Sequence, residues 1–531
     1  MTFFCIFAIV ALVAALVCSF VEERRDLMML QQNSYRNERY QRWLSQSGDT
    51  TSVMRLVSGA VVLASVSTLS VPVVGLALIT FTSIVNTIIL ARRKYKKPLV
   101  MTPRARRLLF TAMVEILIVI AVTVVGTFCW GWPPELPAVV ALGCYCFSHC
   151  FILLANILLR PVESKINRGF YEKAASRLRS MPDLKVIGIT GSYGKTSTKH
   201  YLNRILSEEF EVCMTPGSFN TTLGVVRTIN EYLKPYDRVF ICEMGAKQPN
   251  DIKEICDLVH PSVGIITAVG EQHLESFKTI ENVQRTKFEL VDSLPSDGLA
   301  IVNDDFKWVA NREVKNVECI RYAVTNTGAA AFRAENIQYT GNGTTFDVVT
   351  PDGKRISLST RLVGECNVSN LLAAVICALS LGMSEDKIRY AVSRIEQVEH
   401  RLNMKRTPGG VTIIDDAFNS NPTGSGMALD VLASMKGGKR IVVTPGMIEL
   451  GDRQYELNAE FGRKIAVSAD VAVIVGEYNR DAITEGIESV ADRSAALHTV
   501  ASFNDAQALL AGILRPGDTI LYENDLPDTF K

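Results

Sequence analysis

The most informative stretch of the chain is a glycine-rich segment, GSYGKTST, which begins at Gly191. It follows an apolar stretch, LKVIGIT, and precedes a stretch of helical character, HYLNRILSEEF. A strand, a glycine-rich turn and a helix in this order are typical of a phosphate-binding loop. Glycines let backbone N–H groups face the phosphates, Lys195 can reach the β and γ oxygens, and the Thr196 hydroxyl can ligate Mg²⁺. The alternative is a tight turn that carries this lysine by chance.

The spacing of this segment differs from the common GxxxxGK[ST] pattern, because Ile189 occupies the position of the first glycine. Its form is TGxxGKT. We predict that a bound nucleotide contacts the whole loop, which consists of Thr190, Gly191, Ser192, Tyr193, Gly194, Lys195, Thr196 and Ser197.

The TGxxGKT form resembles the Mur ligases and the related folylpolyglutamate synthases, and further segments resemble the same family in the same order along the chain. They cover residues 186 to 526 and are CEMGAKQPNDI (242–252), ITAVGEQHLESF (266–277), ENVQRTKFEL (281–290), GECNVSNLLAAVICAL (364–379), HRLNMKR with IDDAFNSNP (400–422) and TPGMIELG (444–451). The last segment is most similar to the branch of the family that adds D-alanyl-D-alanine. So many motifs in one order exclude coincidence.

The resemblance implies ATP as a substrate and two Mg²⁺ ions, with Thr196 and Glu243 as ligands of one ion and His273 as a ligand of the other. It also implies that Lys287 is carbamylated by CO₂ and ligates metal, which requires a neutral amine and therefore a lowered pKa. Without the resemblance, Glu243 would be a capping or solvated acid, His273 a hydrogen-bonded loop residue and Lys287 part of a solvated helix face. A shifted register would exchange Lys287 with Arg285.

The same resemblance implies roles for residues nearer the C-terminus. Asn367 and Asn370 would lie beside the adenine ring, although Cys366 stands where the family usually has a histidine. Arg401 would contact the phosphates. The resemblance therefore implies four catalytic residues, which are Lys195, His273, Lys287 and Arg401.

Asp416 would bind the ribose hydroxyls. Phe418 replaces a tyrosine of the family, which keeps a stacking face and loses a hydroxyl. Ordinary loop residues after a strand are the alternative interpretation of Arg401, Asp416 and Phe418.

The elements that must position these residues follow an α/β pattern. Short apolar strands alternate with helical stretches from Lys185 onward, which favours a mostly parallel sheet covered by helices. A β-rich insert is expected over 331–362, with a hairpin at PDGK. We predict a P-loop Mur-ligase central domain over 161–398 and a Rossmann-like C-terminal domain over 399–531.

Residues 1–160 are predicted to form an α-helical transmembrane region. Apolar runs cover 3–20, 57–90, 108–130 and 137–159. The run of 57–90 is too long for one perpendicular span, and basic residues flank it on both sides, so the positive-inside rule favours a hairpin that turns near Ser70 to Pro72. This gives about five spans with an outside N-terminus and cytoplasmic catalytic domains at a bacterial cell membrane. A re-entrant or tilted pair is the alternative to the hairpin.

The overall composition gives no reason to expect a polyanionic partner, since 56 basic and 55 acidic residues nearly cancel. We expect no nucleic acid. The twelve cysteines contain no CxxC pair, which argues against a zinc ribbon. The region that binds the UDP of the substrate in the family has no counterpart here, and the membrane region is expected in its place.

Three functions are compatible with the sequence. The first is ligation of a dipeptide, D-alanyl-D-alanine, or of an amino acid to a muramoyl peptide or a related cell-wall precursor. The second is a Mur-type ligation of another carboxylate, on a lipid-linked intermediate or a different polymer. The third is an ATP-binding membrane subunit without catalysis, against which two predicted metal sites argue. Membrane lipid and other cell-wall enzymes are the further partners we expect.

Overall fold

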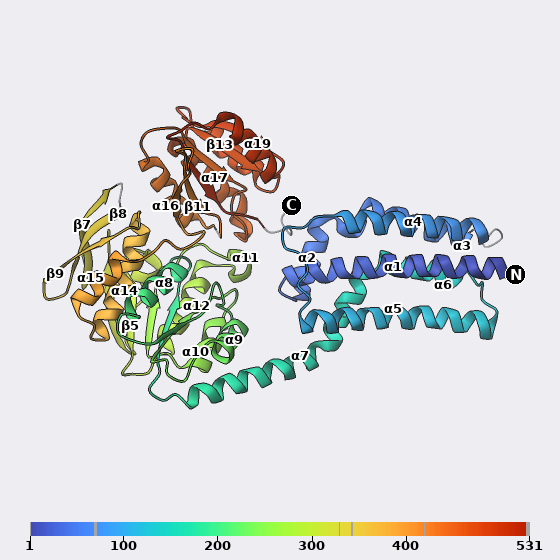
Figure 1. Ribbon diagram of the computed structural model, residues 1–531, viewed down its shortest axis with the longest axis horizontal. Coiled ribbons are helices and arrows are strands. Elements are labelled where there is room, and N and C mark those ends of the chain that lie inside the picture. The colour runs from blue at the N-terminus through green and yellow to red at the C-terminus, as the bar shows by residue number, and fades with distance from the viewer. Residues whose placement is uncertain (1, 68–71, 329, 341–342, 419, 527–531) are drawn as a thin grey trace. The chain divides into compact units, whose positions relative to one another are not determined.

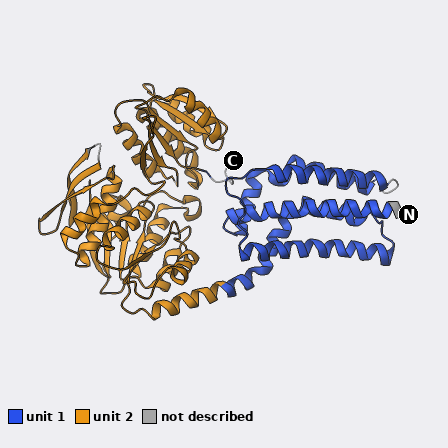
Figure 2. Ribbon diagram, in the orientation of Figure 1, with its two compact units in different colours: residues 1–166, 526–531 blue, residues 167–525 orange. Residues whose placement is uncertain are grey.

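The computed structural model describes residues 2–67, 72–328, 330–340, 343–418 and 420–526 (Figure 1). The chain divides into two compact units (Figure 2). The first contains the residues up to Ile166 together with Leu526, and the second contains residues 167–525. The domain boundaries at residues 160 and 398 stay predictions.

The first unit is a bundle of helices (Figure 1). Its central helix is α1, which packs against α4, α5 and α6. Alanines on α1, among them Ala8, Ala11 and Ala15, are buried in the core, and such small side chains let neighbouring helices approach closely. The helices are α1 (Thr2–Gln32), α2 (Asn37–Ser47), η1 (Asp49–Thr51), α3 (Val53–Ser67), α4 (Pro72–Arg92), α5 (Pro103–Trp130), α6 (Leu136–Cys146) and α7 (Ser148–Arg179), the last of which ends in the second unit.

Three of these helices are long and apolar enough to cross a membrane, and they cover Phe4–Gln32, Pro72–Arg92 and Pro103–Trp130. The pair α6 and α7, bent by 75°, provides a fourth if it counts as one span. Helix α3 is apolar but has only 15 residues, fewer than the roughly 20 that a perpendicular span needs. Of the predicted turn near Ser70 to Pro72, residues 70 and 71 lie outside the described residues, and Pro72 is the first residue of α4. Helix α3 packs against α4.

The structure differs from the expected uninterrupted span over 137–159. The helix breaks at Phe147, and a new helix runs from Ser148 through Pro161 to Arg179. The break is stabilised by Arg55 of α3, whose guanidinium donates to the carbonyls of Tyr145 (3.3 Å) and Cys146 (2.9 Å) at the end of α6. A distant arginine thus satisfies carbonyls that an uninterrupted helix would bind itself.

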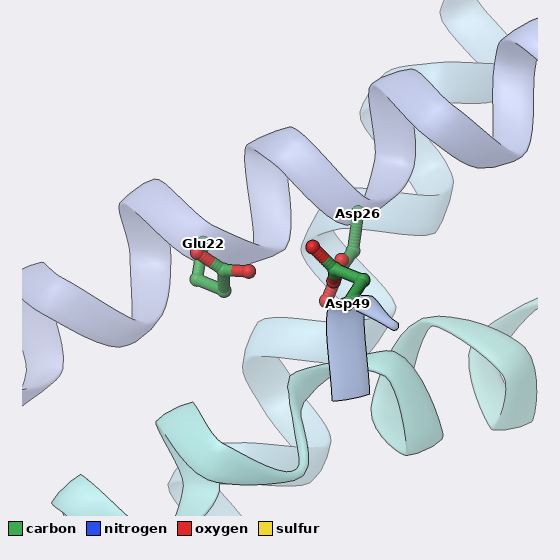
Figure 3. Close-up of side chains that lie close together, drawn as sticks. All are labelled: Glu22, Asp26 and Asp49. Atoms are coloured by element: carbon green, nitrogen blue, oxygen red, sulfur yellow. The ribbon is translucent and has the colours of Figure 1, made fainter. Parts of the chain in front are cut away.

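Arg55 also belongs to a buried charged cluster with Arg25 and three acids. Figure 3 shows the acids, which are Glu22, Asp26 and Asp49. The Arg55 guanidinium lies 2.7 Å from Glu22, 3.3 Å from Asp26 and 3.4 Å from Asp49. Arg25 pairs with Glu22 at 2.7 Å and also with Asp49. The two guanidinium groups supply the positive charge that a metal ion would bring to the three acids. Because the paired residues belong to α1, η1 and α3, the cluster holds these three helices together.

The first lobe of the second unit is built on one sheet, in which strands β1 to β7 run parallel. The strand order is β2-β3-β1-β4-β5-β6-β7-β8-β9. The strands are β1 (Lys185–Thr190), β2 (Val212–Met214), β3 (Val239–Glu243), β4 (Val263–Ile266), β5 (Leu299–Asn303), β6 (Glu318–Ala323), β7 (Phe332–Thr340), β8 (Gly343–Val349) and β9 (Arg355–Thr360).

Helices cover both faces of this sheet, as the strand pattern predicts. Adjacent residues of β1 belong to the cores on opposite faces of the sheet. Ile187 packs with α8, α14 and α15, and Val186 packs with α9, α10 and α12. Strand β1 lies between β3 and β4, where the chain changes direction along the sheet, and ligands of such sheets bind at this point beyond the carboxyl ends of the strands. The helices are α8 (Lys195–Leu206), α9 (Thr222–Glu231), α10 (Asp251–Val259), α11 (Leu274–Phe277), α12 (Ile280–Asp292), α13 (Lys307–Ala310), α14 (Glu365–Ser380) and α15 (Glu385–Ser393).

The β-rich segment expected over 331–362 continues the sheet and does not form a separate layer. Strand β7 pairs with β6, and β8 and β9 form the predicted antiparallel hairpin around Pro351 to Lys354. The turn is closed by a hydrogen bond of 3.0 Å from the Thr350 N–H to the Lys354 carbonyl.

The second lobe is a smaller α/β sandwich with the strand order β10-β11-β15-β12-β13-β14, parallel except for β10. Helices α16, α17 and α18 share one core and α19 packs on the other face. The elements are β10 (Asn403–Arg406), β11 (Thr412–Asp416), α16 (Pro422–Ser434), β12 (Arg440–Thr444), η2 (Gly451–Arg453), α17 (Gln454–Ser468), β13 (Val471–Val475), α18 (Arg480–Glu488), β14 (Ala496–Val500), α19 (Phe503–Ile513) and β15 (Thr519–Glu523).

Candidate functional site

The glycine-rich loop follows β1 and leads into α8, the context that the sequence predicts. Gly191 and Gly194 both have positive φ, 153° and 81°. A Cβ atom at Gly194 would lie 2.4 Å from the Asn370 Oδ1 atom, so a side chain there would displace the Asn370 side chain. The Lys195 ammonium donates to the Gly191 carbonyl at 2.6 Å, which places this cation at the loop itself. A Cβ atom at Gly191 would lie 2.1 Å from the Thr267 Oγ1 atom, so positive φ and close neighbours together explain why both positions are glycine.

Hydrogen bonds fix the loop to the ends of the neighbouring strands. The Thr190 hydroxyl donates to the Met244 carbonyl (2.8 Å) just after β3. The Ser192 N–H donates to the Ala268 carbonyl (2.8 Å), and its hydroxyl donates to the Gly270 carbonyl (3.0 Å), both after β4. The phosphate loop and the two segments with the predicted metal ligands therefore form one rigid edge.

Two predicted magnesium ligands meet at this edge. The Thr196 Oγ1 atom lies 3.2 Å from the Glu243 Oε1 atom, and Glu243 is 1% exposed at the end of β3. Burial alone would raise the pKa of Glu243, but Lys199 and Lys195 outweigh it and lower this pKa, so the carboxylate stays charged. A hydroxyl and an ionised carboxylate next to a phosphate loop fit Mg²⁺, which prefers oxygen ligands.

Lys199 is a residue that the sequence analysis missed. It is fully buried, and its Nζ atom lies 2.9 Å from the Glu243 Oε2 atom and donates to the Gly217 carbonyl at 2.6 Å. Because Lys199 pairs with Oε2, the Oε1 atom of Glu243 is the oxygen that contacts Thr196. The available signal was its position one helical turn after Lys195, which puts both lysines on one face of α8.

The structure distinguishes Lys287 from its neighbour on α12, since Lys287 is 2% exposed whereas Arg285 faces solvent. Burial, followed by the charge of Lys195, lowers the pKa of Lys287 to about 7. Burial likewise lowers the pKa of Lys195 to about 8. Near neutral pH Lys287 therefore holds a substantial fraction of neutral amine, the form that reacts with CO₂.

His273 lies after β4, and burial lowers the pKa of its imidazole. Its Nδ1 atom contacts the carboxylate of Glu449, a residue of the second lobe to which the sequence analysis gave no role. Within the described part of the chain, neither His273 nor Lys287 makes a hydrogen bond to Thr196 or Glu243. The structure thus brings together the first predicted pair of ligands and places the other two at the same edge of the sheet without direct contact.

Seven of the twelve predicted nucleotide residues line one pocket beside the phosphate loop, namely Tyr193, Gly194, Ser197, Asn367, Asn370, Arg401 and Asp416. The other five, which are Thr190, Gly191, Ser192, Lys195 and Thr196, belong to the loop but are not among the residues that line this pocket. Asn370 accepts a hydrogen bond from Thr198 (3.3 Å), and Asn367 accepts one from the Tyr201 hydroxyl (2.7 Å), so both amides are tied to α8. Cys366 lines the pocket, and burial raises the pKa of its thiol to about 12. An aromatic pair also lines it, with the rings of Tyr193 and Phe306 5.1 Å apart.

Residues of the second lobe complete the pocket. Arg401 and Asp416 both line it, and the Asp416 carboxylate accepts a hydrogen bond of 3.1 Å from the Leu402 N–H. Burial raises the pKa of Asp416 although Arg401 acts in the opposite direction. The Arg401 guanidinium lies 4.3 Å from the Phe418 ring centre, so this ring orients the arginine by a cation–π contact.

Comparison with known proteins agrees with this arrangement. The Mur ligase middle domain matches residues 189–378, and the Mur ligase glutamate ligase domain matches residues 400–522. A UDP-N-acetylmuramoyl-tripeptide--D-alanyl-D-alanine ligase of Escherichia coli is 30% identical over 335 residues, which cover 62% of this chain and 74% of the relative. The chain belongs to the Mur ligase family. It is accordingly an ATP-dependent ligase that uses Mg²⁺, with the two α/β domains of the family.

Other relatives point to the same branch. The enzyme of the same name from Mycobacterium bovis is 32% identical over 359 residues, with coverage of 64% of this chain and 70% of the relative. The crystal structure of MurF from Acinetobacter baumannii aligns with a TM-score of 0.62 and 28% identity over 68% of this chain and 77% of that one. Both family matches lie outside the helical unit.

Proposed function

We propose that this Mur ligase joins D-alanyl-D-alanine to a UDP-linked or lipid-linked muramoyl tripeptide at the cytoplasmic face of a bacterial membrane. The observation that carries the proposal is the shared edge formed by the phosphate loop, Glu243 and buried Lys287. The substrates come from the names of relatives that are 30% and 32% identical. The TPGMIELG segment, with its resemblance to the same branch, supports this choice.

The reaction has two steps in which negative charge develops. A carboxylate oxygen of the acceptor attacks the γ-phosphorus of ATP and ADP leaves; the amine nitrogen of the dipeptide then attacks the acyl carbon, loses a proton, and phosphate leaves. Lys195 stabilises charge on the transferred phosphoryl group, and Arg401 does so from the second lobe. Asn367, Asn370 and Asp416 hold the nucleoside.

Thr196 and Glu243 would hold one Mg²⁺ ion, and His273 with Lys287 the second. Bound Mg²⁺ would neutralise negative charge on the phosphate oxygens. We propose that Lys287 is carbamylated, since its burial and lowered pKa favour the neutral amine. The carbamate would turn a buried cation into an anionic oxygen ligand, which fits Mg²⁺ better than an amine does.

We propose that residues 1–160 form a transmembrane region of about five spans. The support is the outward-facing apolar surface of its helices, on which Ile9, Phe81, Ile118 and Phe128 are exposed. Such surfaces are rare on soluble monomers and are expected where helices face lipid. The central and C-terminal domains would then cover 161–398 and 399–531, and other cell-wall enzymes would be neighbours in the same membrane.

A phosphate-release assay tests the proposed function. The full-length protein in detergent is given ATP, Mg²⁺, a panel of UDP-linked and lipid-linked muropeptides, and D-alanyl-D-alanine or single amino acids. Release that requires both a tripeptide acceptor and the dipeptide is expected, with the ligated product confirmed by mass. Turnover that requires a different carboxylate would replace the acceptor, and release without any amide product would contradict the ligase.

A further inference from the structure

A carboxylate of the second lobe reaches a predicted metal ligand of the first. Glu449 lies in the TPGMIELG loop after β12, and its side chain contacts the Nδ1 atom of His273. The other carboxylate oxygen lies 3.5 Å from the ammonium of Lys247, four residues after Glu243. One side chain therefore touches both segments that carry predicted metal ligands.

The loop that presents Glu449 is firmly held in its own lobe. The Met447 N–H donates to the side chain of Asn458 (2.9 Å), and Asn479 donates to the Met447 carbonyl (3.0 Å). Asn524 donates to the Gly446 carbonyl at 2.6 Å. Glu449 itself has a φ of 63°, a left-handed conformation that is uncommon for residues other than glycine. Three asparagine side chains thus fix a strained loop, as expected where backbone geometry serves a function.

The backbone repeats the contact between the lobes. The Glu275 N–H, two residues after His273, donates to the Glu449 carbonyl at 3.2 Å. A Cβ atom at Gly451 would lie 3.2 Å from the Glu275 nitrogen, so the two chains approach closely. A separate ion pair joins Arg453 to Glu271. Glu449 is therefore positioned by both its loop and its neighbours.

We infer that Glu449 is a positioning residue that orients His273 for metal binding when the two lobes are in contact. The inference rests on the proposed metal role of His273. With Nδ1 bound to the carboxylate, Nε2 is the nitrogen left for the metal, and carboxylates that hold metal-binding histidines in this way strengthen binding. Because Glu449 belongs to the other lobe, contact of the lobes and binding of the second ion would favour each other.

The test measures Mn²⁺ binding by electron paramagnetic resonance, on the full-length protein saturated with a non-hydrolysable ATP analogue. Glu449→Ala should weaken the second ion about 10- to 100-fold and leave the first unchanged, since partners of this kind contribute such factors to metal affinity. Glu449→Gln should lose less, because its amide oxygen still accepts the Nδ1 hydrogen. Arg453→Ala is the matched control: it breaks an ion pair between the lobes that does not involve Glu449 or His273, and it should leave the second ion within a factor of about three.

The other outcomes separate the inference from the proposal beneath it. Unchanged binding in Glu449→Ala, or an equal loss in Arg453→Ala, would overturn the positioning role while His273→Ala still lost the second ion. If His273→Ala kept the second ion, the metal role of His273 would be wrong, and the positioning role with it. Wild-type protein that bound both ions but formed no amide would contradict the ligase function alone.

Discussion

Three lysines near the phosphate loop show how burial alone does not determine what a charged residue can do. Lys199 is fully buried beside an ionised carboxylate, 2.9 Å away, and this pairing offsets the cost of its burial. Lys195 donates to backbone carbonyls of the loop. Lys287 has no ion pair among the described residues, and its pKa falls to about 7. The first lysine therefore suits positioning, the second binding of phosphate, and the third chemical modification.

Lys195→Ala is expected to reduce turnover about 10²- to 10³-fold or more, because the developing charge on the phosphoryl group loses its nearest cation. Phosphate release with a fixed acceptor measures the effect. Lys253→Ala, which removes an exposed lysine of the same lobe, is the control and should retain normal turnover. Near-normal ligation by Lys195→Ala would contradict the phosphate-loop assignment.

Lys287→Ala should be nearly inactive and partly rescued by small carboxylates such as acetate, which can supply the missing oxygen ligands. The measurement is phosphate release against acetate concentration. Arg285→Ala, on the exposed side of the same helix, should behave like the wild type with or without acetate. Full activity of Lys287→Ala would end the carbamate proposal.

The pH dependence of carbamylation follows from the pKa of Lys287. Burial lowers it from 10.5 to about 7, so the neutral amine dominates above pH 7 and is lost as the pH falls below it. Protein depleted of CO₂ should therefore regain activity on addition of bicarbonate readily at pH 8 and poorly at pH 6. Equal recovery at both pH values would contradict control of the modification by this lowered pKa, and activity that does not depend on CO₂ at either pH would contradict the carbamylation itself.

At the scale of elements, local motifs were predictable and long-range contacts were not. Short stretches of neighbouring residues are enough to recognise the order of strand, glycine-rich loop and helix around Gly191. The same is true of the acid at the end of β3. The contact of Glu449 with His273 joins residues 176 positions apart, and the break at Phe147 depends on Arg55. The sequence pattern of a single segment does not contain such partners, so an apolar run looked like one continuous span.

Arg55→Met should destabilise the helical unit by about 3–5 kcal/mol, because it leaves Glu22, Asp26 and Asp49 with less positive charge in a buried site. The carbonyls of Tyr145 and Cys146 at the end of α6 would also lose their hydrogen bonds to Arg55, which lowers the stability further. The change in stability is measured by thermal unfolding in detergent, monitored through the reactivity of buried cysteines. Arg106→Met, which removes an exposed arginine of α5, should have little effect, and adding Asp26→Asn to Arg55→Met should restore part of the stability.

The proposed membrane hairpin over residues 57–90 makes a prediction about sidedness. Cysteines introduced by Glu38→Cys and Lys97→Cys should react with a membrane-impermeant reagent only after permeabilisation, because both flanking loops are basic and are expected inside. Pro133→Cys should react in intact cells. The exposed native cysteines, Cys5, Cys129 and Cys150, are replaced beforehand. If residues 38 and 97 were labelled from opposite sides of the membrane, the hairpin would be wrong and the segment between them would cross the membrane once.

At the scale of the whole molecule, the question is what the helical unit contributes to a ligase whose family matches cover residues 189–378 and 400–522. The energy that binds the substrate must come from contacts that some part of the protein makes. A membrane can substitute for part of that binding, since confining two partners to one surface raises their effective concentration without new contacts. A plain anchor would give no such gain with a soluble acceptor.

The two roles differ in how the rate depends on lipid. Full-length protein is reconstituted in vesicles with a lipid-linked muropeptide, and inert lipid is added at constant bulk concentrations of enzyme and acceptor. If the helical unit presents the acceptor, the rate should fall as the acceptor is diluted within the membrane, because its surface concentration sets the encounter. The UDP-linked acceptor is the control and should be insensitive to added lipid. A rate with the lipid-linked acceptor that ignores surface dilution, together with equal or better use of the UDP-linked one, would leave the helices as an anchor.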